Sequence, residues 1–228
     1  MNFFQPEGTK CSLKFFQRAI THSPDILQPE GLAKIEWRSP LEELKKRTYS
    51  DKSFLKCFGL EKSWDKLSDF WPSGGPKWYV LGQISPDSPV LVEVKAETKT
   101  KTKFGEVTSN SCKAKAKGKS RSQIIAAFKK VCDDLGIQST HQGWEANWTG
   151  KYYQYANRIS HLWWLRKQGL DAKLLFINFI DAKKGEEQAC QDEWKDEFAK
   201  ADRVLGLPLT HKLSEYIHHI YPNVNDIP

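Results

Sequence analysis

The sequence predicts an α/β fold in which a mixed sheet carries helices on both faces. Two strand-like runs, 78–84 and 90–96, are joined by the turn residues 85–89 and predict a β-hairpin. Two helical patterns, a β-rich run at 173–180 and a third helical pattern at 185–205 follow them. This order of elements is typical of a mixed sheet with helices on both faces.

Composition supports a folded chain with a substantial core. Of the 228 residues, 39% are hydrophobic and 12% aromatic, including nine Trp, whereas disordered chains are poor in aromatics. The net charge of +7 permits a polyanionic partner. The five cysteines form no CxxC pair, which argues against a zinc site and a disulfide framework. With no signal-peptide pattern and no membrane-length apolar run, we expect a soluble, cytoplasmic protein without a membrane partner.

The N-terminal part, residues 1–70, is expected to be a helical extension packed on an α/β domain formed by residues 71–228. Short helices are predicted at 13–20 and 40–47, the second opened by Ser39 as N-cap. The Trp-Pro-Ser-Gly-Gly-Pro-Lys segment at 71–77 has the composition of a turn before the hairpin.

The C-terminal part alternates helices with one strand. Ser120 and Gln123 suggest a capping box that opens a helix ended by Gly136. Trp144 and Trp148 are expected in a polar connection, before a strong helix at 151–167.

The first candidate for chemistry is the strand Val-Leu-Val-Glu-Val-Lys-Ala at 90–96. Strand alternation places Glu93 and Lys95 on one face, among apolar neighbours. Metal-assisted phosphodiester hydrolysis needs these residue types: Glu93 supplies a hard oxygen for Mg²⁺, and Lys95 orients water or neutralises the transition state. The alternative is an ordinary ion pair at a sheet edge.

The second candidate is the helix at 151–167. At about 100° per residue, one stripe carries four polar side chains and the opposite stripe is apolar. Arg158 is suited to a phosphate and Gln154 to a base edge or a metal-bound water. The alternative is a buried hydrogen-bond network against the sheet. The polar stripe consists of Gln154, Asn157, Arg158 and His161.

The third candidate is a basic segment directly after the Glu93–Lys95 strand. Between Lys95 and Arg121 lie nine Lys or Arg and two acids, an excess equal to that of the whole chain. Such a segment suits the neutralisation of a nucleic-acid backbone, although charge runs are also found in merely solvated loops. Its predicted nucleic-acid-binding residues, with three from the helix stripe, are Lys99, Lys101, Lys103, Lys113, Lys115, Lys117, Lys119, Arg121, Arg158, Asn157 and His161.

Four segments together resemble an uncharacterised bacterial branch of the PD-(D/E)XK, restriction-endonuclease-like superfamily. They are the Trp-Pro turn at 71–78 and the segments 91–96, 153–162 and 173–179, in the same order. The resemblance covers about 70–207 and implies a three-layer α/β/α core, a Mg²⁺ (or Mn²⁺) site and DNA or RNA as substrate. It implies that Glu93 is a metal-binding acid and Lys95 the catalytic lysine.

One position departs from that family. Its strand after the Trp-Pro turn begins Trp-Asp, and the Asp is the principal metal ligand, whereas this chain has Tyr79. A phenol is neutral at pH 7 and binds Mg²⁺ poorly. Glu97, on the same strand face as Glu93 and Lys95, is the preferred replacement, with Glu43, Asp69 and Asp87 as the other acids considered.

Two functions follow from these observations. The first is a Mg²⁺-dependent nuclease, with Glu93, Lys95 and Gln154 as catalytic residues and Glu93 and Glu97 as metal ligands. The second is a weakened or inactive nuclease-fold protein that binds nucleic acid or another protein, in which the metal is weakly bound or absent. The expected partner is nucleic acid, DNA in preference to RNA, and a homodimer is compatible with the resemblance.

Overall fold

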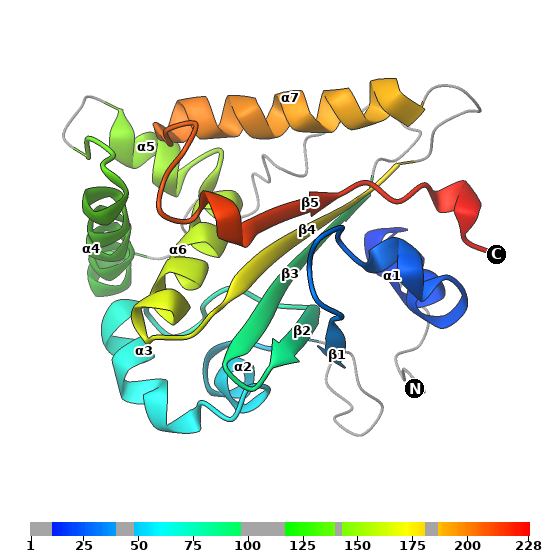
Figure 1. Cartoon of the computed structure of the whole chain (residues 1–228). Helices are drawn as coiled ribbons and strands as arrows, with labels where there is room; N and C mark the ends of the chain where they lie inside the picture. The colour runs from blue at the N-terminus through cyan, green and yellow to red at the C-terminus, as the bar shows by residue number, and fades with distance from the viewer. Residues whose placement is uncertain (1–10, 40–47, 97–116, 140–142, 181–186) are drawn as a thin grey trace.

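A five-stranded mixed sheet forms the centre of the computed structural model, which describes residues 11–39, 48–96, 117–139, 143–180 and 187–228 (Figure 1). The strand order is β1-β2-β3-β4-β5. The first two pairings are antiparallel and the last two are parallel. The strands are β1 (Glu36–Ser39), β2 (Val80–Ser85), β3 (Ser88–Ala96), β4 (Lys173–Phe179) and β5 (Ile217–Ile220).

Helices cover both faces of this sheet, so the chain has a three-layer α/β/α architecture, as predicted (Figure 1). Helix α1 packs on one face, against β3, and the other six helices contribute to the larger core on the opposite face. The helices are α1 (Cys11–His22), α2 (Asp51–Lys56), α3 (Trp64–Phe70), α4 (Gly118–Leu135), α5 (Trp144–Thr149), α6 (Tyr153–Lys167) and α7 (Glu187–Leu205).

Side-chain alternation divides the strands between the two cores. On β4, Leu174 and Phe176 face the larger core under α6 and α7, whereas Leu175 and Ile177 face the smaller core under α1. Because both faces of β3 and β4 are covered, both strands are apolar along most of their length. A charged residue on either strand is therefore buried between layers.

The predicted hairpin, the helix around 13–20, the helix at 151–167 and the strand at 173–180 are all confirmed. Two local predictions are wrong. The helix expected to start at Ser120 starts at Gly118, with Lys117 as its N-cap residue, so Ser120 lies inside its first turn. Trp148, expected in a polar connection, is buried because its indole nitrogen donates to Leu205 O at 2.9 Å.

The first 70 residues contribute more than helices. Residues 36–39 form the edge strand β1, which pairs with β2. The helix predicted at 40–47 lies outside the described residues. No helix in the described part of the chain has both the length and the apolar character needed to cross a membrane.

Candidate functional site

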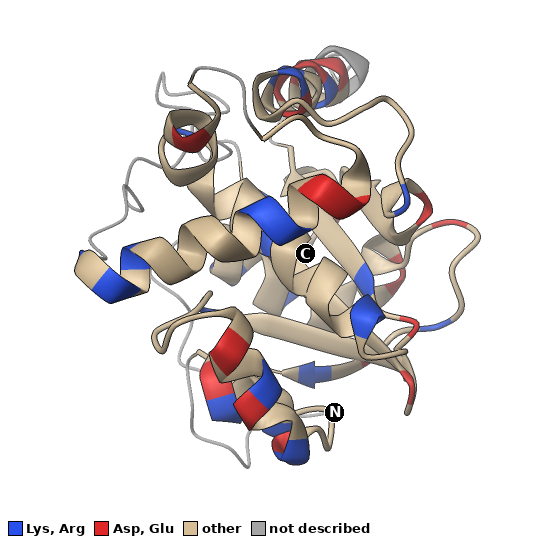
Figure 2. Cartoon of the chain, turned by 90° about the vertical axis from the view of Figure 1, so that its left-hand side faces the viewer, with Lys and Arg blue, Asp and Glu red and all other residues tan. Residues whose placement is uncertain are grey.

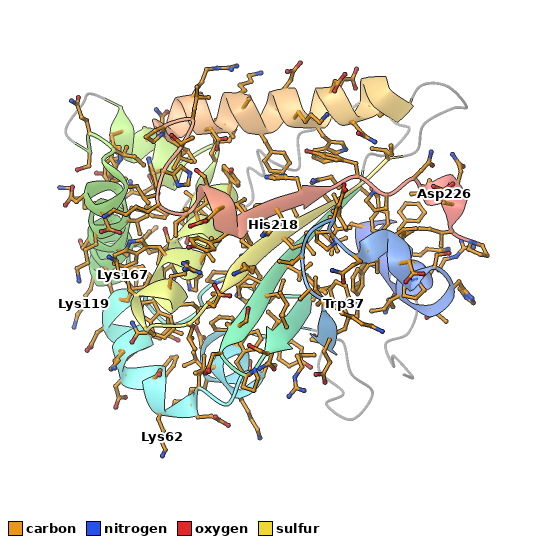
Figure 3. All side chains as sticks on the ribbon, in the orientation of Figure 1. Trp37, Lys62, Lys119, Lys167, His218 and Asp226 are labelled. Atoms are coloured by element: carbon orange, nitrogen blue, oxygen red, sulfur yellow. The ribbon has the colours of Figure 1, made fainter. Side chains whose placement is uncertain are left out.

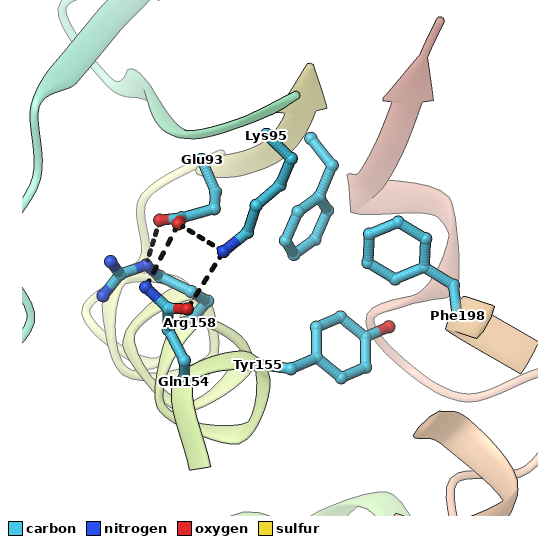
Figure 4. Close-up of a pocket in the computed structure, with 7 residues that line it drawn as sticks. Glu93, Lys95, Gln154, Tyr155, Arg158 and Phe198 are labelled. Atoms are coloured by element: carbon cyan, nitrogen blue, oxygen red, sulfur yellow. Dashed lines mark hydrogen bonds and ion pairs between the residues drawn. The ribbon is translucent and has the colours of Figure 1, made fainter. Parts of the chain in front are cut away.

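Four polar side chains from β3 and α6 meet between the sheet and the helix layer (Figure 4). The Glu93 carboxylate lies 3.1 Å from Lys95 Nζ, measured at Glu93 Oε1. Lys95 Nζ donates to Gln154 Oε1 at 2.9 Å, and Gln154 Nε2 donates back to Glu93 Oε1 at 3.3 Å. Arg158 completes the group, called here the Glu93 cluster: Glu93, Lys95, Gln154 and Arg158.

Arg158 holds the second oxygen of the same carboxylate. Its Nε donates to Glu93 Oε2 at 2.7 Å, while its two terminal nitrogens donate to Asn157 Oδ1 and Lys77 O. The guanidinium lies over the Trp78 ring, 4.2 Å from its centroid, an arrangement favourable for a cation. One side chain thus connects α6 to β3 and to the segment before β2.

The Glu93 cluster is nearly closed to solvent. The side chains of Glu93, Lys95 and Arg158 are only 12%, 8% and 4% exposed. Burial alone would raise the pKa of Glu93, but Arg158 and Lys95 outweigh it and lower the pKa, so the carboxylate is ionised at neutral pH. Two cations thus face one carboxylate.

Local sequence explains this convergence. On β3 the alternation places Glu93 and Lys95 toward α6, as predicted, and on α6 residues 154 and 158 are one turn apart on the same side. Parallel pairing sets Glu93 beside Phe176 and Lys95 beside Asn178. A small cavity beside the cluster has about 10 Å³ available to a water centre, room for about one water molecule.

The remaining polar residues of the helix stripe lie deeper. His161 is 2% exposed and its Nδ1 lies 2.9 Å from Asn157 O. Rings of Trp71, Phe54 and Phe70 surround it, with centroids at 5.0 to 6.3 Å. Burial lowers the pKa of His161 to about 3, so the imidazole is neutral at pH 7. In this position neither Asn157 nor His161 is accessible to nucleic acid.

Tyr79 occupies a different environment from the one expected by strand alternation. Strand β2 begins only at Val80, and Tyr79 is 38% exposed. The preceding residue, Trp78, is buried and packs under Arg158. Within the described residues no hydrogen bond joins the Tyr79 phenol to Glu93 or Lys95, and the Tyr79 carbonyl accepts from Ser39 Oγ.

The predicted basic segment is described only at its end. Lys117 and Lys119 are exposed at the start of α4, and Lys119 projects away from the sheet (Figure 3). Arg121 donates to Glu145 at 2.6 Å. Acidic and basic residues are interspersed on the helices in Figure 2. Outside the described residues lie Glu97, Lys99, Lys101, Lys103, Lys113 and Lys115.

Sequence reasoning missed one polar residue next to the Glu93 cluster. Asn178, the register partner of Lys95, is completely buried, and its Oδ1 has no hydrogen-bond partner among the described residues. Its Nδ2 makes only a long hydrogen bond, 3.4 Å, to Phe176 O. The signal was present in the sequence as an amide inside an otherwise apolar strand run.

The oxygen donors here suit a hard divalent cation, with one carboxylate instead of two. Carboxylate and amide oxygens are the ligands that Mg²⁺ takes in proteins, and Glu93, Gln154 and the unpartnered Asn178 oxygen are of this kind. Across the described ranges, no three His, Cys, Asp or Glu residues gather at one point. A second carboxylate would have to come from elsewhere, and Glu97 is the residue that the sequence suggests.

No protein-family model matches the chain, and no curated protein or solved structure is significantly similar to it. The resemblance to the PD-(D/E)XK superfamily therefore stays a prediction, and the argument for function rests on the geometry of the Glu93 cluster.

Arg158→Ala is expected to destabilise the protein by about 3–5 kcal/mol, because it leaves the Glu93 carboxylate and two other buried acceptors short of a donor. Urea unfolding of the wild type and the variant measures this loss. Arg158→Lys, which keeps the charge but not the contacts of a planar guanidinium, should lose less. An unchanged urea midpoint for Arg158→Ala would mean that the ion pair does not hold α6 to the sheet.

His161→Phe is expected to flatten the pH dependence of stability. The unfolded state binds a proton near pH 6.5 and the folded state only near pH 3, so His161 makes stability fall as pH decreases between these values. The slope of about 1 kcal/mol per pH unit should disappear in the variant. Urea unfolding at pH 5, 6 and 7 tests this, and equal slopes for both proteins would contradict it.

Proposed function

We propose that this chain is a metal-dependent nuclease that hydrolyses phosphodiester bonds of nucleic acid, with DNA as the favoured substrate. The observation that carries the proposal is the convergence of Glu93, Lys95 and Gln154 within 3.3 Å of one another. Burying an ionised group is costly even when it is paired, so such a cluster between two layers favours a functional role.

Each residue of the cluster has a chemical role in this proposal. Glu93 is a hard oxygen ligand that stays ionised, and Glu97 is the expected second acid. Lys95 neutralises the charge that develops on the phosphoryl oxygens, because its ammonium is already held beside the carboxylate. Gln154 orients that ammonium through its amide oxygen. When bound, Mg²⁺ supplies Lewis-acid polarisation and a more acidic bound water.

Plasmid nicking and Mn²⁺ calorimetry on the same preparations test the proposal. The wild type is expected to cut in Mg²⁺ or Mn²⁺. Lys95→Met should lose at least 100-fold in cleavage while Mn²⁺ still binds, because the lysine acts on the phosphoryl group and not as a metal ligand. Tyr79→Asp should strengthen metal binding and raise activity, and Glu97→Ala should reduce both.

Lys62→Met, at an exposed lysine labelled in Figure 3, is the matched control and should cut like the wild type. If neither the wild type nor Tyr79→Asp cuts plasmid or single strands, the nuclease proposal is wrong. If Glu97→Ala alone abolishes cleavage, the metal site includes a relocated acid.

A second candidate function is nucleic-acid binding without cleavage. Two observations favour it: the Glu93 cluster holds two cations against one carboxylate, and the position of the family's metal ligand holds an exposed tyrosine. Excess positive charge attracts phosphodiesters without any metal.

In this second case affinity for DNA should fall steeply with salt, with a slope of about −0.9 per phosphate contact. Replacing the four basic-segment residues Lys113, Lys115, Lys117 and Lys119 by Ala should flatten that slope in fluorescence-anisotropy titrations. An unchanged slope would show that the basic segment is only a solvated part of the surface.

A further inference from the structure

Asn178 is a polar residue whose position the fold itself does not explain. It lies near the C-terminal end of β4, where Leu174, Phe176 and Ile180 mark the face under α6 and α7 as apolar. Its side chain is fully buried and the carbonyl Oδ1 has no partner in the described part of the chain. An unpaired buried carbonyl of this kind costs about 1–3 kcal/mol, which leucine at the same position would avoid.

Register places this oxygen beside the Glu93 cluster. Asn178 pairs with Lys95 in the parallel β3–β4 ladder, and alternation puts it on the same face as Phe176, which lines the cavity next to Glu93. Neighbouring strands are about 4.8 Å apart and two residues span about 6.6 Å, so the Cα atoms of Glu93 and Asn178 are about 8 Å apart. Carboxylate and amide side chains at that spacing can reach one ion between them.

The chemistry of Oδ1 limits what it can bind. A carbonyl oxygen only accepts, so it cannot hold a phosphate oxygen, which is also an acceptor. It can bind a divalent cation or a water molecule on that cation, and amide carbonyls are ordinary ligands of hard cations. The carboxylate that the family has at position 79 is missing here, and Tyr79 is exposed.

We infer that Asn178 Oδ1 is a second protein oxygen ligand of the divalent cation bound at Glu93, in place of the carboxylate missing at position 79. The inference rests on the proposed function, because it assigns a further ligand to the same site. Lys95 lies beside both residues, so a bound cation competes with its ammonium for Glu93 Oε1.

Mn²⁺ titration of the full chain, by calorimetry and by the electron paramagnetic resonance signal of free Mn²⁺, tests this ligand. Asn178→Leu should weaken Mn²⁺ binding at least tenfold, because the amide oxygen is lost. It should also raise the thermal midpoint, because the unpaired polar group is removed. Asn178→Asp should strengthen Mn²⁺ binding at least tenfold, and Glu93→Gln should abolish it.

Tyr155→Phe is the control for local packing. Tyr155 lines the same cavity but its hydroxyl donates to Asp202 at 2.9 Å, so the variant should bind Mn²⁺ like the wild type. A wild type that binds no Mn²⁺ overturns the inference, and so does Asn178→Leu with unchanged affinity. If Asn178→Leu does not fold, Asn178→Asp decides, and an affinity equal to that of the wild type overturns the inference.

The two proposals fail in different ways. If Mn²⁺ binding depends on Asn178 but no nucleic acid is cut, the metal ligand stands and the nuclease proposal falls. If the wild type cuts DNA and Asn178→Leu binds Mn²⁺ with unchanged affinity, only the role of Asn178 is wrong.

Discussion

The ion pair between Glu93 and Arg158 is the interaction on which the arrangement around it depends. A lone carboxylate between a sheet and a helix layer would be strongly destabilising, so its burial requires cations at hydrogen-bonding distance. Arg158 supplies one and also caps Lys77 O and covers Trp78. Helix α6, strand β3 and the segment before β2 are therefore connected through one guanidinium, and a change at Arg158 affects all three.

Much of the fold could be predicted from hydrophobic patterns. The hairpin, the strand at 173–180 and the long helices have clear periodicity and end signals, such as Gly136 in its left-handed conformation. Elements that depend on distant contacts were missed. Strand β5 is short and reads Ile-His-His-Ile, so only its pairing with β4 reveals it, and α5 is recognised only because Trp148 reaches Leu205 on α7. A pattern within one segment carries no information on such partners.

The site was predictable where one periodicity decided the outcome. Strand alternation brings Glu93 and Lys95 together, and helical spacing adds Gln154 and Arg158. The same spacing did not reveal that His161 is enclosed by aromatic rings, because those rings come from other elements. Tyr79 departs from the expectation because β2 begins one residue later and Trp78 packs inside.

Charge counting links the cation and the substrate in the proposed function. Glu93, Lys95 and Arg158 together carry one net positive charge, so a divalent cation alone would add to an uncompensated positive centre in a place with little water. A phosphodiester contributes the negative charge that this centre lacks. Each therefore favours the binding of the other, and by linkage the gain in affinity is the same in both directions. A neutral ligand such as Asn178 in place of a second carboxylate makes this dependence stronger, since the protein then supplies less of the negative charge itself. A site built in this way binds metal weakly when empty of nucleic acid and more tightly when nucleic acid is bound.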